Sequence, residues 1–242
     1  MKELIKKQVR DWYSLLEPLV ETKGFEKVMQ EISKIRSSGT TVYPNEANMF
    51  EAFNLCTYNK LQVVILGQDP YHDGSATGLA FANYISNKKI SPSLTNIFIA
   101  IEMDYDLDSV DFNTNLESWA KQGVLLLNTA LTVEKGNPGS HSAMWKPFTE
   151  RFIEKLSTER DNLVFLLWGK HAQKYEKYIK GNNKIFKAAH PAAEIYSGGN
   201  SGFYTCNHFS ATNSCIKTPI DWFKDDDAEE YFIHKEEEEL PF

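Results

Sequence analysis

Short apolar runs alternate along the chain with longer stretches in which apolar residues recur every three or four positions. Runs of this length that end at polar or turn-forming residues are typical of buried strands, and the longer spacing is typical of helices. The apolar runs are 61–66, 124–127, 163–167 and 185–189; the helical stretches are 2–16, 24–36, 45–56 and 145–156, with a further helix start at 91–93. The alternation predicts an α/β fold: a central four-stranded parallel sheet flanked by helices on both faces, in three α/β/α layers.

Chemically active side chains follow the apolar runs. The first run leads into Gly67-Gln68-Asp69-Pro70-Tyr71-His72, and the later runs lead into Asn128, Trp168 and His190. Each of these residues alone is an ordinary turn or cap residue. Because ligands bind at the carboxyl ends of the strands in open α/β sheets, their recurrence at several strand ends favours a common site.

Charge divides the chain into two parts. Residues 225–242 hold nine acidic residues and one lysine, a net charge of −8, whereas the whole chain carries −7. Residues 1–224 are therefore close to neutral, and they can present a local basic face to a nucleic acid. The length and the 42% hydrophobic content predict one domain over 1–224. The acidic segment 225–242 is predicted to be a flexible tail.

Cysteine usage and hydropathy predict a cytoplasmic protein. No run of about eighteen apolar residues occurs, and the first residues form a charged amphipathic pattern rather than a secretory leader. Cys56, Cys206 and Cys215 form no Cys-x-x-Cys pair, which is typical of reduced thiols. No spacing of His and Cys typical of a zinc or iron–sulfur site is present, so neither a metal nor another cofactor is expected.

Several short motifs stand out along the chain. They are the segments 67–72, 78–81 (Gly-Leu-Ala-Phe), 91–94 (Ser-Pro-Ser-Leu), 125–129, 190–191, 206–209 (Cys-Asn-His-Phe) and 218–222. These motifs occur in the order found in family 1 uracil-DNA glycosylases, which the chain resembles over about 55–222. The resemblance implies a monofunctional enzyme that hydrolyses the N-glycosidic bond of uracil in DNA and leaves an abasic site. It implies uracil-containing single- or double-stranded DNA as substrate, and a monomer.

The resemblance implies catalytic roles for Asp69 and His190. Cleavage of the bond develops positive charge on the deoxyribose and negative charge on the base, so the reaction needs an anion near the sugar and a hydrogen-bond donor at the base. Asp69 would position the attacking water and stabilise the sugar cation. His190, while neutral, would donate to uracil O2. The competing interpretations are a turn-forming Asp-Pro step and an ordinary histidine before proline.

The resemblance also implies which residues bind the base. Asn128 would pair with uracil N3–H and O4 and reject cytosine, whose pattern is opposite. Tyr71 would close the space at C5 against thymine, and Phe81 would stack on the flipped base. Phe81 also fits an ordinary core position in a strand-like alternation. Gln68 would bind the base or the water, and His141 would line the water site.

DNA contacts are expected at two places. Ser93 resembles the family's phosphate-binding loop at a helix start. After His190-Pro191 the family usually has Ser-Pro-Leu-Ser, whose leucine fills the space left by the flipped base; here a longer, glycine-rich loop covers 192–202. Direct register puts Glu194 at the leucine position, where a carboxylate would face bases and phosphates. Ile195 or Tyr196 is therefore predicted as the wedge, with Ser197 or Ser201 at a phosphate.

The acidic segment ends in Leu240-Pro241-Phe242, which resembles the tip of bacterial single-stranded-DNA-binding proteins. It would bind a basic-rimmed apolar pocket on a replication or repair protein, or compete with phosphate for the DNA-binding face of this chain. The alternative is a solvated tail.

Three other functions remain open from the residues. They are a mismatch-type glycosylase of the same superfamily, a non-catalytic DNA or polymerase adaptor, and a phosphate-ester hydrolase. Asp69 and Tyr71 argue against the first, and the presence of Asp69, Asn128 and His190 together argues against the second. The third would require a metal site or phosphate-binding glycines, neither of which is evident.

Overall fold

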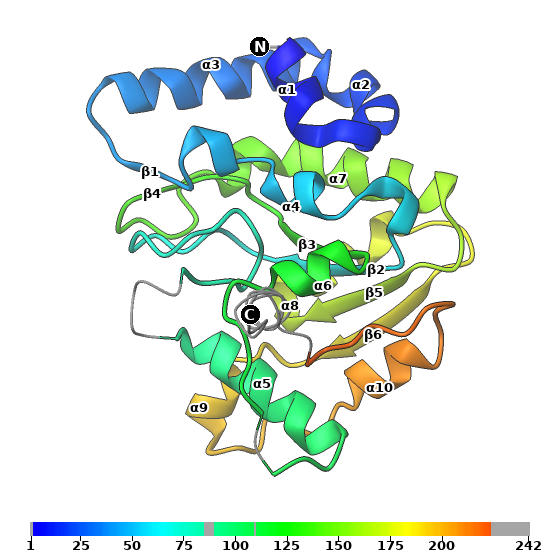
Figure 1. The fold of residues 1–242 in the computed structure, drawn as a ribbon. Coiled ribbons are helices and arrows are strands. Elements are labelled where there is room, and N and C mark those ends of the chain that lie inside the picture. Colours follow the sequence, from blue (N-terminus) through cyan, green and yellow to red (C-terminus); the bar gives the residue numbers. More distant parts are fainter. Residues whose placement is uncertain (1, 85–89, 109, 224–242) are drawn as a thin grey trace, which may run out of the picture.

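The computed structural model describes residues 2–84, 90–108 and 110–223, and its centre is a parallel sheet. Four strands lie in the order β3-β2-β5-β6 (Figure 1). They are β2 (Val63–Gly67), β3 (Val124–Asn128), β5 (Val164–Trp168) and β6 (Lys184–Ala188). The first three are buried at every position, as strands covered on both faces must be, whereas β6 is a half-buried edge strand. The predicted sheet is confirmed.

Helices cover both faces of this sheet (Figure 1). On one side lie α1 (Lys2–Val9), α2 (Tyr13–Val20), α3 (Lys23–Ser37), α4 (Glu51–Leu55) and α7 (Ser142–Glu159). On the other side lie α5 (Pro92–Asp104) and α10 (His208–Asn213). Short helices begin or end strand connections: α6 (Glu117–Lys121), α8 (Gly169–Gln173) and α9 (Ala193–Ser197). The predicted three-layer architecture is confirmed.

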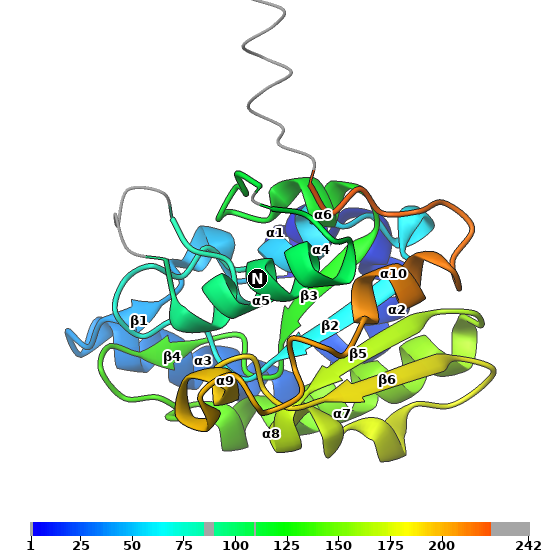
Figure 2. The same ribbon diagram turned by 90° about the horizontal axis from the view of Figure 1, so that it is seen from below.

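A small antiparallel pair, which the sequence pattern did not indicate, lies beside the carboxyl ends of the sheet (Figure 2). It consists of β1 (Val42–Tyr43) and β4 (Val133–Glu134). Both strands are two residues long, too short to produce a recognisable alternation of apolar and polar residues.

The N-terminal helix predicted over 2–16 is interrupted. A 3₁₀ turn, Arg10–Trp12, separates α1 from α2, and Arg10 has φ of +51°, which no α-helix accommodates. The turn aims Trp12 into the core, where the indole N–H donates to the Cys56 carbonyl at 2.5 Å. The stretch predicted as one helix over 45–56 is likewise divided, into a 3₁₀ turn, Glu46–Asn48, capped by Asn45, and α4. Tertiary burial overrides the helical period in both places.

Within the described ranges, no helix has the length and apolar character needed to cross a membrane.

His208, within the Cys-Asn-His-Phe segment, has a structural role beneath the sheet edge. Its Nδ1 accepts a hydrogen bond from Trp168 Nε1 at 3.0 Å, and only 5% of the residue is exposed. Burial lowers the pKa of His208 to about 4, because a charge there would lose its hydration. His208 is therefore neutral in the folded chain at neutral pH.

We expect His208 to make the fold sensitive to acid. Between pH 6.5 and pH 4 the unfolded chain binds a proton at this residue and the folded chain does not, so stability falls as the pH is lowered through this range. At about 1.4 kcal/mol per pKa unit, the loss is about 3 kcal/mol. Urea unfolding at several pH values would measure it. His208→Asn, which keeps an acceptor for Trp168, should give a smaller loss; an equal loss in both proteins would contradict the prediction.

Candidate active site

The register of the sheet brings the strand ends together. Gly67, the last residue of β2, is paired with Asn128 on β3, and Trp168 on β5 is paired with Ala188 on β6. Asp69 and His190 lie two residues beyond the ends of their strands. The sequence therefore predicted correctly that these side chains share one edge of the sheet.

Two glycines make this proximity possible. A Cβ on Gly67 would lie 2.3 Å from Asn128 Oδ1, and a Cβ on Gly169 would lie 2.8 Å from His190 Cβ. Gly169 also has φ of +82°, a conformation that disfavours other residues. Both glycines are needed for the amide and the imidazole to reach their positions.

One oxygen of the Asp69 carboxylate accepts a backbone hydrogen bond, and the other has no partner in the part of the chain that the structure describes. Its Oδ2 accepts a hydrogen bond of 2.6 Å from the backbone N–H of Gly139. Its Oδ1 is buried and has no hydrogen-bond partner among the described residues. A buried carboxylate oxygen of this kind normally binds a donor, and a water molecule is the simplest one.

The hydrogen bonds of His190 define which nitrogen carries its proton. The backbone N–H of Ala192 donates to His190 Nδ1 at 3.2 Å. Since Nδ1 accepts, the neutral ring carries its hydrogen on Nε2. Burial, and secondarily the nearby His171, lower the pKa of His190, so the neutral form is favoured. His190 is thus a neutral donor at the strand edge.

Tyr71, Phe81 and Asn128 form the walls around these groups. The Tyr71 hydroxyl hydrogen-bonds to Ser91 Oγ and donates to the Phe81 carbonyl, and burial raises the pKa of Tyr71 to about 12. The Phe81 ring centroid lies 6.1 Å from that of His190 and 5.6 Å from that of Trp168. The Asn128 amide is 5% exposed and has no hydrogen-bond partner within the described residues. The walls are rigid, and the amide is available to a ligand.

Phe81 does not belong to a strand, contrary to the strand-like alternation in the sequence. It has φ of +67°, outside the region that strands use. The segment bends there, because Ala80 N–H donates to Leu126 O and Tyr71 holds the Phe81 carbonyl. The strained backbone aims the ring at the site rather than into a sheet.

Gln68 and His171 are joined through Thr129. The Thr129 hydroxyl donates to the Gln68 carbonyl at 2.9 Å and lies 2.8 Å from His171 Nε2. Since the hydroxyl hydrogen is used, His171 Nε2–H is the donor to Thr129. Burial lowers the pKa of His171, and the Asp69 carboxylate opposes this effect. The Gln68 side chain itself is exposed at the mouth of the site.

His141 lies behind the loop that holds Asp69. It is 1% exposed, its Nδ1 lies 2.8 Å from Thr132 Oγ1, and its Nε2 lies 3.6 Å from a Glu134 oxygen. Burial lowers the pKa of His141. Gly139, which binds Asp69, is two residues away in the chain. The described contacts therefore link His141 to the site through this loop.

Ser93 occupies the first turn of α5. Ser91 is the N-cap and accepts from Leu94 N–H, and Pro92 is the first helical residue. The half-buried Ser93 hydroxyl and the unused amide groups of this turn form a surface suited to an anion.

The loop after His190 is organised by Glu194, which is 2% exposed. Its carboxylate accepts backbone N–H bonds from Ser201, Phe203 and Tyr204 at 2.6–3.0 Å. These bonds hold the pKa of Glu194 below its usual range although burial opposes them. Glu194 therefore points inward and does not occupy the wedge position of the direct register.

Two apolar side chains on α9 point outward as a result. Ile195 is 53% exposed and Tyr196 is 88% exposed. Ser197 is half-buried, and its hydroxyl donates toward Glu194. The loop is anchored to α5, because Asn96 donates to the Pro191 carbonyl at 2.8 Å and accepts from the Tyr204 hydroxyl at 2.8 Å.

Sequence reasoning missed the supporting groups. Gly139, Thr129, His171 and the two close-packed glycines were not assigned, since backbone donors and backbone clearance leave little trace in residue types. His171 alone had a signal, because it follows the end of β5 as Asp69 follows the end of β2. In the described part of the chain, no group of three or more His, Cys, Asp or Glu side chains is placed to hold a metal.

The fold, and the residues at the carboxyl ends of its strands, were compared with known protein families. The family model described as "Uracil DNA glycosylase superfamily" matches residues 53–216. The chain therefore belongs to the uracil DNA glycosylase superfamily, and the enzyme class predicted from the sequence is confirmed.

Curated relatives and a solved structure agree with this family. The chain is 41% identical over 221 residues to uracil-DNA glycosylase 1 of Listeria innocua, covering 88% of this chain and 97% of that one. It is 39% identical over 219 residues to the uracil-DNA glycosylase of Pseudoalteromonas translucida, covering 88% and 98%. The crystal structure of mimivirus uracil-DNA glycosylase superposes with a TM-score of 0.80 at 26% identity, covering 88% and 86%.

Proposed function

We propose that this chain hydrolyses the N-glycosidic bond between uracil and deoxyribose in DNA, with Asp69 and His190 as catalytic residues. The observation that carries the proposal is the presence, at one edge of the sheet, of a carboxylate oxygen that has no hydrogen-bond partner among the described residues and of a neutral imidazole donor. The names of the relatives agree with the same chemistry.

In the proposed reaction the bond to uracil breaks as positive charge grows on the sugar. Asp69 stabilises this cation and orients a water molecule through Oδ1. The water oxygen then bonds to the sugar carbon, and the proton that the water loses passes to the Asp69 carboxylate. The bonding electrons leave with uracil, whose O2 receives a hydrogen bond from His190 Nε2. Gly139 holds the other Asp69 oxygen, so the carboxylate does not rotate during the reaction.

Selectivity is assigned to Asn128, Tyr71 and Phe81. The Asn128 amide offers a donor and an acceptor that match uracil O4 and N3–H, whereas cytosine leaves both unpaired. The Tyr71 ring, fixed by its hydroxyl, excludes the methyl group of thymine at C5. Phe81 stacks on the base. Gln68 and His141 complete the base and water contacts.

An abasic-site assay tests the proposal. The purified chain is incubated with otherwise identical oligonucleotides containing one uracil, cytosine or thymine, and abasic sites are cleaved by alkali. We expect cleavage at uracil alone, on single strands and opposite either purine in duplexes. Cleavage restricted to a mismatch would instead support a mismatch-type glycosylase, and no cleavage would support an adaptor.

Duplex DNA requires that the target nucleotide be flipped, and we propose α9 for this step. Tyr196 and Ile195 are apolar and exposed, and the Glu194 bonds hold the loop behind them. Ser93 on one side and Ser197 or Ser201 on the other would bind the flanking phosphates.

We expect Tyr196→Ala to reduce excision from duplex DNA by about tenfold or more, since an empty space left in the stack costs a few kcal/mol. Excision from single-stranded DNA needs no wedge and should change less than about twofold. Single-turnover rates on the two substrates measure the difference, and the single strand is the internal control. Ile195→Ala is the parallel test; if neither variant affects duplex excision, the wedge lies elsewhere.

We also propose that the protein is a monomer and is located in the cytoplasm. The acidic segment 225–242, which lies outside the described residues, is predicted to bind a replication or repair protein.

A further inference from the structure

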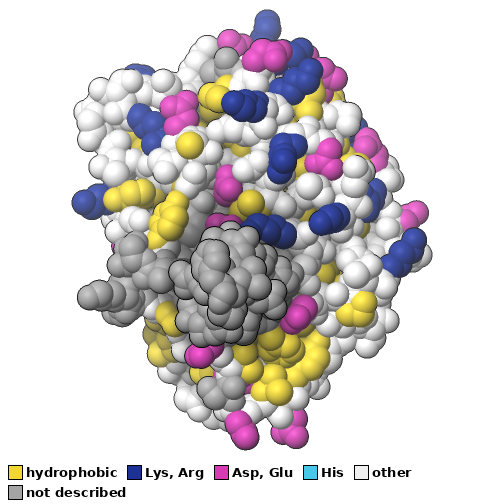
Figure 3. Space-filling model, in the orientation of Figure 1, with side chains coloured by type: hydrophobic (Ala, Val, Ile, Leu, Met, Phe, Trp, Pro, Cys, Tyr) yellow, Lys and Arg dark blue, Asp and Glu magenta, His cyan; other side chains and the backbone are white. Residues whose placement is uncertain are grey.

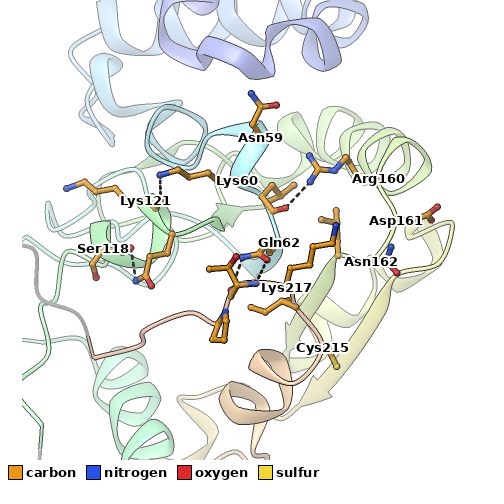
Figure 4. A pocket seen from close by; sticks show the side chains of 16 residues that line it. Asn59, Lys60, Gln62, Ser118, Lys121, Arg160, Asp161, Asn162, Cys215 and Lys217 are labelled. Atoms are coloured by element: carbon orange, nitrogen blue, oxygen red, sulfur yellow. Dashed lines mark hydrogen bonds between the residues drawn. The ribbon is translucent and has the colours of Figure 1, made fainter.

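A cavity lies at the edge of the sheet opposite the proposed catalytic residues. Its volume is about 870 Å³ (Figure 4). Segments 59–62 and 160–163 line it just before β2 and β5 begin, 118–122 lines it just before β3, and 215–219 closes it. None of these residues belongs to the active site. The cavity therefore has no part in the reaction proposed above.

The cavity is rimmed by cations. Lys60, Lys121, Arg160 and Lys217 line it, against one acidic side chain in the lining, Asp161; Lys121 also pairs with Glu117, its ammonium 3.4 Å from a carboxylate oxygen. Lys60 and Lys121 are brought together, because the Lys60 ammonium donates to the Lys121 carbonyl at 3.4 Å (Figure 4). Over the upper and right-hand parts of the face shown in Figure 3, Lys and Arg side chains are interspersed with Asp and Glu side chains. The excess of positive charge favours an acidic occupant.

Two of these basic groups differ in how they are held. The Arg160 guanidinium donates to the Tyr58 and Leu61 carbonyls at 2.7 and 3.0 Å, so its charge is fixed at the rim. Lys217 is exposed and forms no ion pair with any residue in the described ranges. One fixed and one unpaired charge on the rim of the same cavity suit a ligand that carries several carboxylates.

The floor of the cavity is apolar, and the wall formed by 215–219 is fixed by hydrogen bonds. Leu61, Leu163, Ile216 and Pro219 contribute the apolar lining. The Gln62 side chain donates to the Thr218 carbonyl at 3.0 Å and accepts from the Thr218 N–H at 3.1 Å. A rigid, partly apolar floor beneath a basic rim fits a peptide in which carboxylates are followed by apolar residues.

Such a peptide begins beside the cavity in this same chain. Gln122, which lines the cavity, exchanges two hydrogen bonds of 2.8 and 2.9 Å with the Asp221 backbone. Two residues later the described part ends, and 225–242 follows with a net charge of −8. Within it, four consecutive glutamates at 236–239 precede Leu240, Pro241 and Phe242. The twelve residues 224–235 that connect the described part to these glutamates can span up to about 43 Å, ample for a return to the cavity.

We propose that residues 236–242 bind in this cavity of their own chain. The glutamates face Lys60, Lys121, Arg160 and Lys217, and the apolar residues contact the floor. A tethered segment has an effective concentration in the millimolar range, so weak affinity suffices to fill the cavity. Binding at this edge also keeps the acidic segment away from the edge where DNA phosphates are expected, and it does not depend on the proposed function.

Cys215 provides a probe, because it lines the cavity and is exposed, whereas Cys56 is buried and Cys206 is half-buried. The experiment measures the rate at which an uncharged maleimide labels Cys215 in the full chain, with Cys215→Ser giving the background. Replacing all four glutamates at 236–239 by glutamine should raise the rate about fivefold at low salt. High salt should raise the rate of the unaltered chain similarly.

Charge reversal separates binding from a general charge effect. Lys217→Glu should also raise the rate, although a new carboxylate near Cys215 would by itself disfavour the reactive thiolate. Lys217→Glu combined with a single glutamate-to-lysine change within 236–239, tried at each position in turn, should restore part of the protection in the pair that regains opposite charges, and Lys27→Glu on α3 should change nothing. An unchanged rate in the glutamine variant would overturn the proposal. So would protection that disappears on dilution of the protein, since it would place the segment in a neighbouring copy.

Discussion

Replacing Asp69 by asparagine should reduce uracil excision by about a thousandfold with little change in substrate affinity. The variant keeps the shape of the side chain but removes the only charge proposed to stabilise the sugar cation and orient the water. Because that stabilisation exists only in the transition state, the loss should appear in kcat rather than in KM. Single-turnover rates on a single-stranded uracil oligonucleotide measure it, with thermal unfolding to confirm that the fold is intact.

Asp73→Asn is the matched control for this change. Asp73 lies four residues further along, is exposed, and accepts hydrogen bonds from the N–H and hydroxyl of Ser75. Asp73→Asn removes one negative charge near the same edge of the sheet, as Asp69→Asn does, but it changes no group proposed to bind the water. We expect its rate to stay within about threefold of the unaltered chain. If Asp69→Asn falls by no more than Asp73→Asn, Asp69 has no catalytic role.

Replacing His190 by leucine should reduce kcat by about 10²- to 10³-fold, the usual cost of removing one donor from a developing anion. The charge on uracil O2 would then lack its hydrogen bond. The same assay on single-stranded DNA measures this loss without any contribution from base flipping. A loss of less than about fivefold would contradict the assignment.

The protonation state of His190 makes a second, independent prediction. Burial and the neighbouring His171 lower the pKa of His190, so the neutral ring persists above pH 6.5. Protonation would place a hydrogen on Nδ1 and break the bond from Ala192 N–H, displacing the ring. The rate should therefore be constant from about pH 7 to 8 and should fall, not rise, as the pH drops below the pKa of His190. A rate that rises on acidification would instead indicate a charged donor.

The wedge loop shows where residue types and packing disagree. Direct alignment of the sequence places Glu194 where the family has its wedge leucine. A carboxylate there would face bases and phosphates, and this cost correctly excluded Glu194 as the wedge. What the sequence did not show is that the carboxylate is the buried acceptor for three backbone amides of the returning loop. Isolated residue types do not reveal such a role, because the three donors become partners only when the loop closes.

Several features of this protein follow from local sequence alone. Apolar runs placed all four strands of the sheet: burial on both faces requires continuous hydrophobicity in β2, β3 and β5, and the apolar run 185–189 marked the half-buried edge strand β6. The parallel order then put Asp69, Asn128 and His190 at one edge, since the carboxyl ends of parallel strands coincide. Only the tertiary structure decided how they are held: the backbone N–H of Gly139, seventy positions from Asp69, donates to the Asp69 carboxylate. The tertiary structure also formed the cavity lined by Lys60, Lys121, Arg160 and Lys217, whose residues come from four segments. Such contacts join segments distant in sequence, and the period of a single helix or strand carries no information about them.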